Sequence, residues 1–168
     1  MENFDLYTCC FSGHRSIKLP WKYNEKGIRF LCCKLKLKKA IKKAIKKGYR
    51  LFVCGMALGS DILFAELVLS LKAKHLNIFL ECAIPCVNQT EKWYPKSVAR
   101  YNAILSKADF VTMVTDKKYT NGCMQKRNKY MLEKSSLLIS VYDGTKGGTE
   151  QTVILAKQMG IETIIIKP

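Results

Sequence analysis

Leu6-Tyr-Thr-Cys-Cys-Phe11 is a short run of apolar and β-prone residues that leads directly into the polar segment Ser12-Gly-His-Arg-Ser16. A run of this length predicts a buried strand, and a glycine directly after it predicts a tight loop between a strand and a helix. Similar runs alternate with helical patterns along the rest of the chain. Strand–loop–helix units in series favour a mainly parallel sheet with helices on both faces.

The rest of the pattern completes this prediction. Further strands are expected at residues 50–54, 78–84, 109–114, 137–142 and 161–166. The longest helix is expected from about Asn24 to Lys47, with Gly48 at its end. Its apolar residues recur at three- and four-residue spacing: Ile28, Leu31, Leu35, Leu37, Ile41, Ala44 and Ile45. The 168 residues therefore predict one three-layer α/β domain of the Rossmann-like kind, spanning residues 1–168.

The charge of the chain points to an anionic partner. There are 29 Lys and Arg residues against 13 Asp and Glu, a formal net charge of +16. This attracts nucleic acids, acidic membranes and phosphate esters alike. No signal peptide and no apolar run of about 20 residues is present, so we expect a cytoplasmic protein without a membrane span.

The eight cysteines do not form a recognisable metal or disulfide pattern. Adjacent pairs such as Cys9-Cys10 alternate faces in a strand, and no CxxC pair or zinc quartet occurs. We interpret the cysteines as reduced core residues and expect no metal site built on them. Cys82 and Cys86, near a loop, are the remaining candidates for redox or metal chemistry.

Glycines follow three of the predicted strands: Gly13 after the first, Gly55 and Gly59 after the second, and Gly144, Gly147 and Gly148 after the fifth. Ligands of open α/β sheets bind at the carboxyl ends of the strands. Glycine lets the backbone approach a ligand closely, and helix N-termini present free N–H groups to anions. The loops match neither a Walker A motif nor a GxGxxG fingerprint. They predict a phosphate-containing ligand without naming it.

Several side chains on the same edge are candidate ligand contacts. Gly147-Gly148-Thr149 is the best phosphate cradle, although a turn with Thr149 as N-cap is the alternative. Arg15 is placed to pair with phosphate. Asp61 either caps its helix or accepts hydrogen bonds from ribose hydroxyls or a metal-bound water.

Other candidates carry two interpretations each. His14 serves as an acid or base, or as a hydrogen-bond spacer. Arg127-Asn128 contacts the ligand or is a surface pair, and Glu66 faces the site or the helix surface. Asn88, in the loop after the third strand, is a further ligand candidate.

The long helix also carries a dense set of lysines: Lys34, Lys36, Lys38, Lys39, Lys42, Lys43, Lys46 and Lys47. Lysines between core positions usually form a solvated face. The alternative is a nucleic-acid or acidic-partner surface, whose binding would depend on salt and not on sequence. We expect this helix to lie away from the glycine loops.

The chain resembles a YpsA-like member of the SLOG superfamily, the group named after Smf/DprA and the LOG phosphoribohydrolases. The blocks that carry the resemblance span nearly the whole chain: Ser12-Gly13-His14-Arg15, Gly55-Met-Ala-Leu-Gly59-Ser-Asp61, Ile84-Pro85 with Gln89 and Trp93, Arg127-Asn128-x-Tyr130-Met131, Tyr142-Asp143-Gly144 and Gly147-Gly148-Thr149. The resemblance implies a DprA-like Rossmann fold that binds nucleotides or nucleotide-derived molecules. Relatives hydrolyse nucleoside monophosphates, bind single-stranded DNA, or sense nucleotide signals in bacteria and their phages.

The sequence departs from the hydrolases of this group at one position. Their PGGxGTxxE-type motif carries a catalytic glutamate three residues after the threonine, whereas that position after Thr149 is Thr152 here, with Glu150 displaced by two residues. One residue is about 100° of rotation on a helix. Our first hypothesis is therefore a binding or sensing protein for a phosphorylated nucleotide derivative. The alternative is a nucleotide N-glycosidase that uses Glu66, Asp61 or Glu150. The resemblance also makes Mg²⁺ a candidate cofactor and a homo-oligomer the expected assembly, and it adds Asp143 and Gly144 to the ligand-binding candidates.

Overall fold

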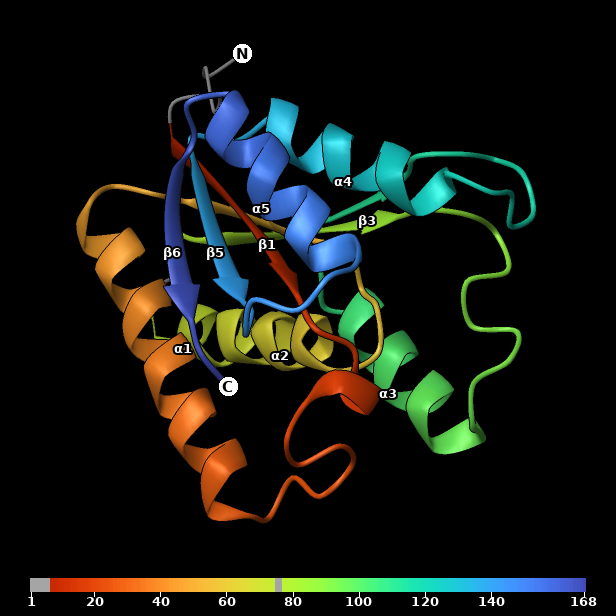
Figure 1. Ribbon diagram of the computed structural model, residues 1–168, viewed down its shortest axis with the longest axis horizontal. Helices are drawn as coiled ribbons and strands as arrows, with labels where there is room; N and C mark the ends of the chain where they lie inside the picture. Colours follow the sequence, from red (N-terminus) through yellow and green to blue (C-terminus); the bar gives the residue numbers. More distant parts are fainter. Residues whose placement is uncertain (1–6, 75–76) are drawn as a thin grey trace.

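The computed structural model describes residues 7–74 and 77–168, in which strands and helices alternate (Figure 1). The strands are β1 (Thr8–Gly13), β2 (Leu51–Cys54), β3 (Phe79–Ile84), β4 (Phe110–Met113), β5 (Leu137–Val141) and β6 (Glu162–Ile166). The helices are α1 (Ile28–Lys46), α2 (Ser60–Lys72), α3 (Pro95–Leu105), α4 (Cys123–Glu133) and α5 (Gly148–Gln158), with a short 3-10 helix, η2 (Ser16–Lys18), after β1.

The six strands form one parallel sheet in the order β4-β3-β2-β1-β5-β6. From β1 the chain moves outward to β4, and it then crosses back to place β5 on the other side of β1. The strand order therefore reverses between β1 and β5, where Gly13 pairs with Val141. Loops leaving adjacent strands diverge at such a point and leave a crevice at the carboxyl edge of the sheet.

Helices cover both faces of the sheet, which makes three layers (Figure 1). Helices α1, α2 and α3 pack on one face, where the rings of Phe11 and Phe64 stack with centroids 4.5 Å apart. Helices α4 and α5 pack on the other face, around Cys10, Val53 and Leu138. Strands buried on both faces favour near-continuous apolar runs, and β2, Leu51–Cys54, is apolar at every position. The predicted three-layer α/β fold is confirmed.

The predicted start of the long helix, at about Asn24, is wrong. Residues 24–27 are not helical, and α1 begins at Ile28 with Gly27 as its N-cap. Three of the apolar residues assigned to its buried face, Ile28, Leu31 and Leu35, are exposed. The face that packs on the sheet consists of Phe30, Cys33, Leu37, Ala40, Ile41 and Ala44. At 100° per residue these two sets lie on nearly opposite sides of the helix, so the sequence pattern had merged two stripes.

All eight cysteines are free thiols; seven are buried and Cys32 is exposed. Among the helices of the described residues, none combines the length and apolar character needed to span a bilayer. The same part of the chain contains no group of three or more His, Cys, Asp or Glu side chains that could hold a metal ion.

Candidate functional site

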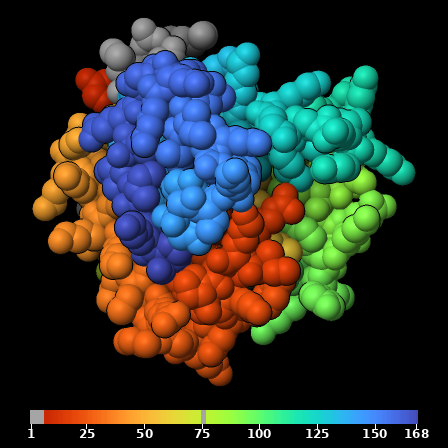
Figure 2. Space-filling model, viewed as in Figure 1, coloured from red at the N-terminus to blue at the C-terminus, as the bar shows by residue number. Residues whose placement is uncertain are grey.

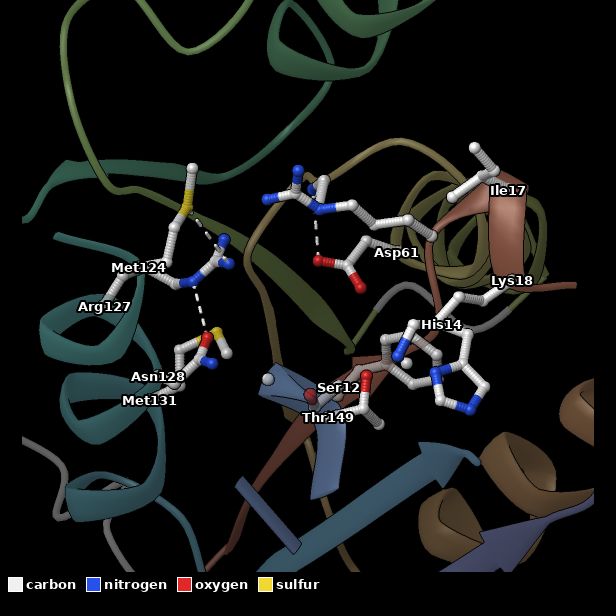
Figure 3. A pocket seen from close by; sticks show the side chains of 15 residues that line it. Ser12, His14, Ile17, Lys18, Asp61, Met124, Arg127, Asn128, Met131 and Thr149 are labelled. Carbon is white, nitrogen blue, oxygen red and sulfur yellow. Dashed lines mark hydrogen bonds between the residues drawn. The ribbon is translucent and has the colours of Figure 1, made fainter. Parts of the chain in front are cut away.

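A cavity of about 180 Å³ lies where the strand order reverses, between the segment after β1, the loop after β2, α4 and the start of α5 (Figure 3). It is lined by Phe11, Ser12, Gly13, His14, Arg15, Ile17, Lys18, Ala57, Asp61, Met124, Arg127, Asn128, Met131, Gly148 and Thr149. The space-filling view shows this face, with the red N-terminal segment lying between the blue α5 and the green and teal segments (Figure 2).

Eight of the residues singled out from the sequence meet in this cavity: Gly13, His14, Arg15, Asp61, Arg127, Asn128, Gly148 and Thr149. The other candidates do not line it: Gly55, Gly59, Glu66, Asn88, Asp143, Gly144, Gly147 and Glu150. Parallel strands bring their carboxyl ends to one edge, so residues from four distant stretches of sequence converge.

Arg127 and Asp61 form the buried floor of the cavity, with exposed fractions of 5% and 4%. Arg127 Nη1 donates to the carbonyl of Gly55, and Nε donates to Asn128 Oδ1 at 2.8 Å (Figure 3). Burial raises the pKa of Asp61, while the Arg127 guanidinium opposes that rise. Burial likewise lowers the pKa of Arg127, and the Asp61 charge opposes it. The two residues therefore stabilise each other's charge, and Arg127 is not a surface residue.

Asp61 does not cap its helix. The N-cap of α2 is Gly59, and Asp61 Oδ2 instead accepts the backbone N–H of Ala57 at 3.1 Å. This bond closes the loop after β2. The capping interpretation of Asp61 is therefore wrong, and its carboxylate fixes the loop while facing the cavity.

The glycines after the first two strands make room for protein atoms. A Cβ added to Gly55 would overlap the Arg127 guanidinium, and one added to Gly13 would overlap Ser60 Oγ. At Gly59, where φ is +104°, an added Cβ would meet the backbone of Ser16. By contrast, nothing lies within 4 Å of a Cβ added to Gly148. Of the glycines that line the cavity, Gly148 is therefore the one that leaves space for a ligand.

Helix α5 starts at the edge of the cavity. Its N-cap is Gly147, so the alternative in which Thr149 caps the helix is wrong. The first N–H groups of a helix have no intrahelical partner, and the helix dipole adds partial positive charge there. Gly148 and Thr149 both line the cavity, so this helix end faces it. The arrangement is an anion-binding geometry.

His14 is buried, and its Nε2 lies 2.6 Å from Asp143 Oδ1. The hydroxyl and backbone N–H of Thr145, followed by His14, hold the pKa of Asp143 well below its usual range. The backbone carbonyl of His14 accepts the Ser60 hydroxyl at 2.8 Å. His14 therefore joins the loops after β1 and β5 and also faces the cavity.

The cavity is rich in positive charge. Arg15 is exposed and forms no ion pair with any carboxylate in residues 7–74 and 77–168. Lys18 Nζ donates to the carbonyl of Lys146 at 2.6 Å, which ties η2 to the loop before α5. The lining of the cavity thus contains three cationic side chains, those of Arg15, Lys18 and Arg127, and one carboxylate, that of Asp61. This balance favours an anionic ligand.

The structure separates two of the three candidate catalytic carboxylates from the cavity. Glu66 accepts two hydrogen bonds from Arg100, at 2.5 and 2.7 Å, and Arg100 also donates to Glu25. Glu150 is in the first turn of α5 but does not line the cavity. Asn88 is likewise engaged elsewhere, with Glu91 and the backbone of Tyr119.

Sequence reasoning missed several lining residues. Met124 and Met131 lie three positions before and four after Arg127, so helical spacing alone would have placed them on its face of α4. Ile17 and Lys18 belong to η2, whose position against the loop before α5 depends on tertiary contacts.

The model of the YspA SLOG family (YpsA) matches residues 9–163. The chain is 31% identical over 140 residues to UPF0398 protein BH1768 of Halalkalibacterium halodurans, covering 82% of this chain and 73% of the relative. It is 28% identical over 145 residues to a UPF0398 protein of Bacillus pumilus, covering 85% and 77%.

Two solved structures share the fold. DNA processing protein A (DprA) of Streptococcus pneumoniae superposes with a TM-score of 0.66 at 14% identity, over 99% of this chain and 52% of that one. DprA of Helicobacter pylori, a single-stranded DNA-binding protein, gives 0.65 at 17% identity, over 100% and 69%. This chain thus spans about half of the pneumococcal protein. The family match covers every strand and helix that forms the cavity, and the chain belongs to the YpsA family of the SLOG superfamily.

Proposed function

We propose that the chain binds a phosphorylated nucleotide or nucleotide-derived small molecule in this cavity, as a sensor or binding protein. The observation that carries the proposal is the open space at Gly148, at the positive end of α5, in a cavity that also contains the exposed Arg15. Phosphate would bind the N–H groups of the helix end, and the planar guanidinium of Arg15 would bind it through two parallel hydrogen bonds.

Asp61 has the complementary role in this proposal. It is the only carboxylate among the described residues that line the cavity, and carboxylates accept hydrogen bonds from sugar hydroxyls. A Mg²⁺ ion would have to be held largely by the ligand's phosphates, because the cavity offers it a single carboxylate.

The small number of carboxylates that line the cavity also favours ligand binding over hydrolysis. Cleavage of an N-glycosidic bond passes through a cationic ribosyl centre that carboxylates stabilise. Glu66 is paired with Arg100 outside the cavity, and Glu150 does not line it. Asp61 alone remains, and it already accepts the Ala57 N–H.

Calorimetric titration with a panel of nucleoside mono- and diphosphates tests the proposal. Gly148→Asp places a negative side chain in the cradle, and Arg15→Ala removes the guanidinium; each should weaken binding at least about tenfold. Arg29→Ala, an exposed arginine of α1, is the matched control and should bind normally. Unchanged affinity in both site variants, with normal thermal unfolding, would refute the assignment of the site.

The enzymatic alternative has its own readout. Chromatography of the same nucleotides after incubation with the protein would detect released base. Release that is abolished by Asp61→Asn would establish turnover, whereas intact nucleotides throughout the panel would support a binding protein.

Helix α1 supports a second candidate function, binding of nucleic acid independent of the cavity. The seven lysines of α1, Lys34, Lys36, Lys38, Lys39, Lys42, Lys43 and Lys46, form no ion pair with a carboxylate of the described residues, whereas Lys47, directly after the helix, pairs with Glu162 at 2.6 Å. None of them lines the cavity. Such a surface binds phosphate backbones through charge alone.

A further inference from the structure

Two more cavities continue from the candidate site. One of about 220 Å³ shares Arg15, Ile17, Ala57 and Met124 with the first cavity. Another of about 500 Å³ shares Ser16, Tyr23 and Leu58 with the second. Because neighbouring cavities share lining residues, the three lie in a row along the contact between residues 15–17 and the loop 57–59, and we call this row the trough. We call them the inner, middle and outer cavities.

The middle cavity has the walls of a site for a planar ring. Trp93 and Tyr23 line it together with Ile17 and Met124. The Trp93 ring is held edge-on against Tyr101, with centroids 5.5 Å apart. Aromatic side chains that are fixed in this way provide stacking surfaces for nucleobases.

Gln89 is the polar group of the middle cavity. Its Nε2 donates to the Gly55 carbonyl at 3.1 Å, and its Oε1 accepts the Tyr101 hydroxyl at 3.2 Å. The amide is therefore held in one orientation beside the ring site. Its position against Gly55 also links the middle cavity to the floor of the inner one, where Arg127 binds the same carbonyl.

The outer cavity is lined by three lysines, Lys22, Lys26 and Lys96. None of them forms an ion pair with a carboxylate anywhere in the described ranges. Glu25 is the one carboxylate among the described residues that line this cavity, and it is paired with Arg100, which also lines it.

The start of α3 strengthens the positive character of the outer cavity. The helix begins at Pro95, and both Lys96 and Ser97, in its first turn, line the cavity. Pro95 has no N–H, and the N–H of Ser97 donates to the Tyr94 carbonyl at 2.9 Å, so the helix adds to the lysine charges mainly through its dipole. The trough thus has an anion-binding end in the inner cavity, an aromatic middle and a second cationic end.

We propose that the trough binds one nucleotide that carries anionic phosphate on both sides of its nucleoside, a nucleoside 3′,5′-bisphosphate unit, either free or as part of a linear dinucleotide. This inference rests on the proposed function, because the first phosphate is the one bound at α5. The base lies in the middle cavity against Trp93, and the second phosphate is bound by Lys22, Lys26 and Lys96. Mononucleotides fill only part of this site.

Titration calorimetry with AMP, adenosine 3′,5′-bisphosphate and the linear dinucleotide pApA tests the proposal. The bisphosphate should bind the unmodified protein at least about tenfold more tightly than AMP, since a second phosphate gains charge-assisted hydrogen bonds. Repeating the series with the uridine compounds covers the pyrimidine case. If pApA also binds more tightly than AMP, a phosphodiester satisfies the outer cavity; if the bisphosphate alone does, a terminal phosphate is required.

Variants distinguish phosphate binding at the outer end of the trough from ligand binding in the rest of it. The triple variant Lys22→Gln/Lys26→Gln/Lys96→Gln should reduce bisphosphate affinity to that of AMP and leave AMP binding within about twofold. Trp93→Leu should weaken both ligands, because both use the ring site. Lys38→Gln/Lys42→Gln/Lys46→Gln removes the same charge from α1, outside the trough, and should change neither affinity by more than about twofold.

Three results would overturn the proposal. Equal affinity of AMP and the bisphosphate for the unmodified protein would show that the outer cavity binds no phosphate. The same loss in the α1 control as in the trough variant would make the effect one of net charge. Failure of every nucleotide to bind would refute the proposed function together with this inference, whereas AMP binding without a gain from the second phosphate would refute this inference alone.

Discussion

His14 and Asp143 are 129 positions apart in the chain, and His14 Nε2 lies 2.6 Å from Asp143 Oδ1. The contact follows from the register of two strands. Gly13 at the end of β1 pairs with Val141 at the end of β5, so the residues that follow them are brought side by side. The pair thereby joins the loop that contains Arg15 to the loop that precedes α5.

The hydrogen bonds that Asp143 accepts from Thr145, together with its contact with His14, should make stability depend on acid pH. Because the pKa of Asp143 is depressed in the folded protein, its carboxylate stabilises the fold above the unfolded pKa of about 3.9, and this contribution is lost as the pH falls toward the folded pKa. We expect Asp143→Asn to lower the urea midpoint at pH 7. The difference from the unmodified protein should shrink below about pH 4. A difference that stays constant from pH 7 to pH 3 would contradict the role given to the Asp143 charge.

Substitution by alanine should destabilise the fold at Gly55 and leave its stability almost unchanged at Gly148. Gly55→Ala forces a methyl group into the Arg127 guanidinium, so we expect a loss of about 1–3 kcal/mol in the free energy of unfolding. Gly148→Ala meets no atom within 4 Å and should change stability by less than about 1 kcal/mol. Thermal and urea unfolding of both variants measures this.

The two alanine variants also distinguish a loss of packing from a loss of ligand binding. Gly148→Ala fills part of the phosphate cradle, so it should weaken nucleotide binding while remaining folded. A folded Gly55→Ala variant with normal stability would show that Arg127 can move, and it would contradict the packing role of that glycine.

A buried charge network on β3 should contribute strongly to stability. Glu81 is 1% exposed, and its carboxylate accepts hydrogen bonds from Thr112, Tyr130 and Lys134, at 2.9, 2.5 and 2.6 Å. Lys134→Met leaves the buried Glu81 charge without its cation and should cost about 2–4 kcal/mol. Glu81→Gln leaves the partly exposed Lys134, which water can solvate, and should cost less, about 1–2 kcal/mol.

A double-mutant cycle measures the Glu81–Lys134 coupling. The double variant should lose less stability than the sum of the single losses, because no unpaired buried charge remains. Strict additivity in urea denaturation would mean that the pair has no net coupling. Nucleotide affinity is the internal control, since neither residue lines the inner cavity.

The lysines of α1 give the test of nucleic-acid binding. If this surface binds, a labelled single-stranded oligonucleotide should be retained at low salt and released steeply as salt rises. Charge reversal at Lys38, Lys42 and Lys46 should reduce both the affinity and the salt slope. Reversal of three exposed lysines elsewhere, Lys74, Lys107 and Lys157, is the matched control. Equal losses in the two variants would mean that net charge, and not α1, attracts the oligonucleotide.

The alternation of apolar runs and helical patterns was enough to predict the layers of this protein and the edge of the sheet where the candidate site lies. Unbroken apolar strands such as Leu51–Cys54 favour burial on both faces, and alternation with helices then gives a parallel sheet. Because parallel strands end on the same edge, the segment after Phe11 and the glycines before α5 had to be neighbours of that edge. The blocks around Gly13, Asp61 and Gly148 were sufficient to identify the family.

Tertiary structure alone decided which side chains face the cavity. Glu66 is bound to Arg100 of α3, and the sequence around Glu66 contains no sign of that partner because the two residues are 34 positions apart. The buried stripe of α1 was also ambiguous, since two apolar stripes existed and only contact with the sheet selects one. Likewise, Gly55 is open to a ligand in any local view of its loop, and it is the arrival of Arg127 from 72 positions away that fills the space. Local pattern fixes which residues are polar, small or apolar, but the partners that occupy their surroundings come from distant segments, and only the packed structure brings these together.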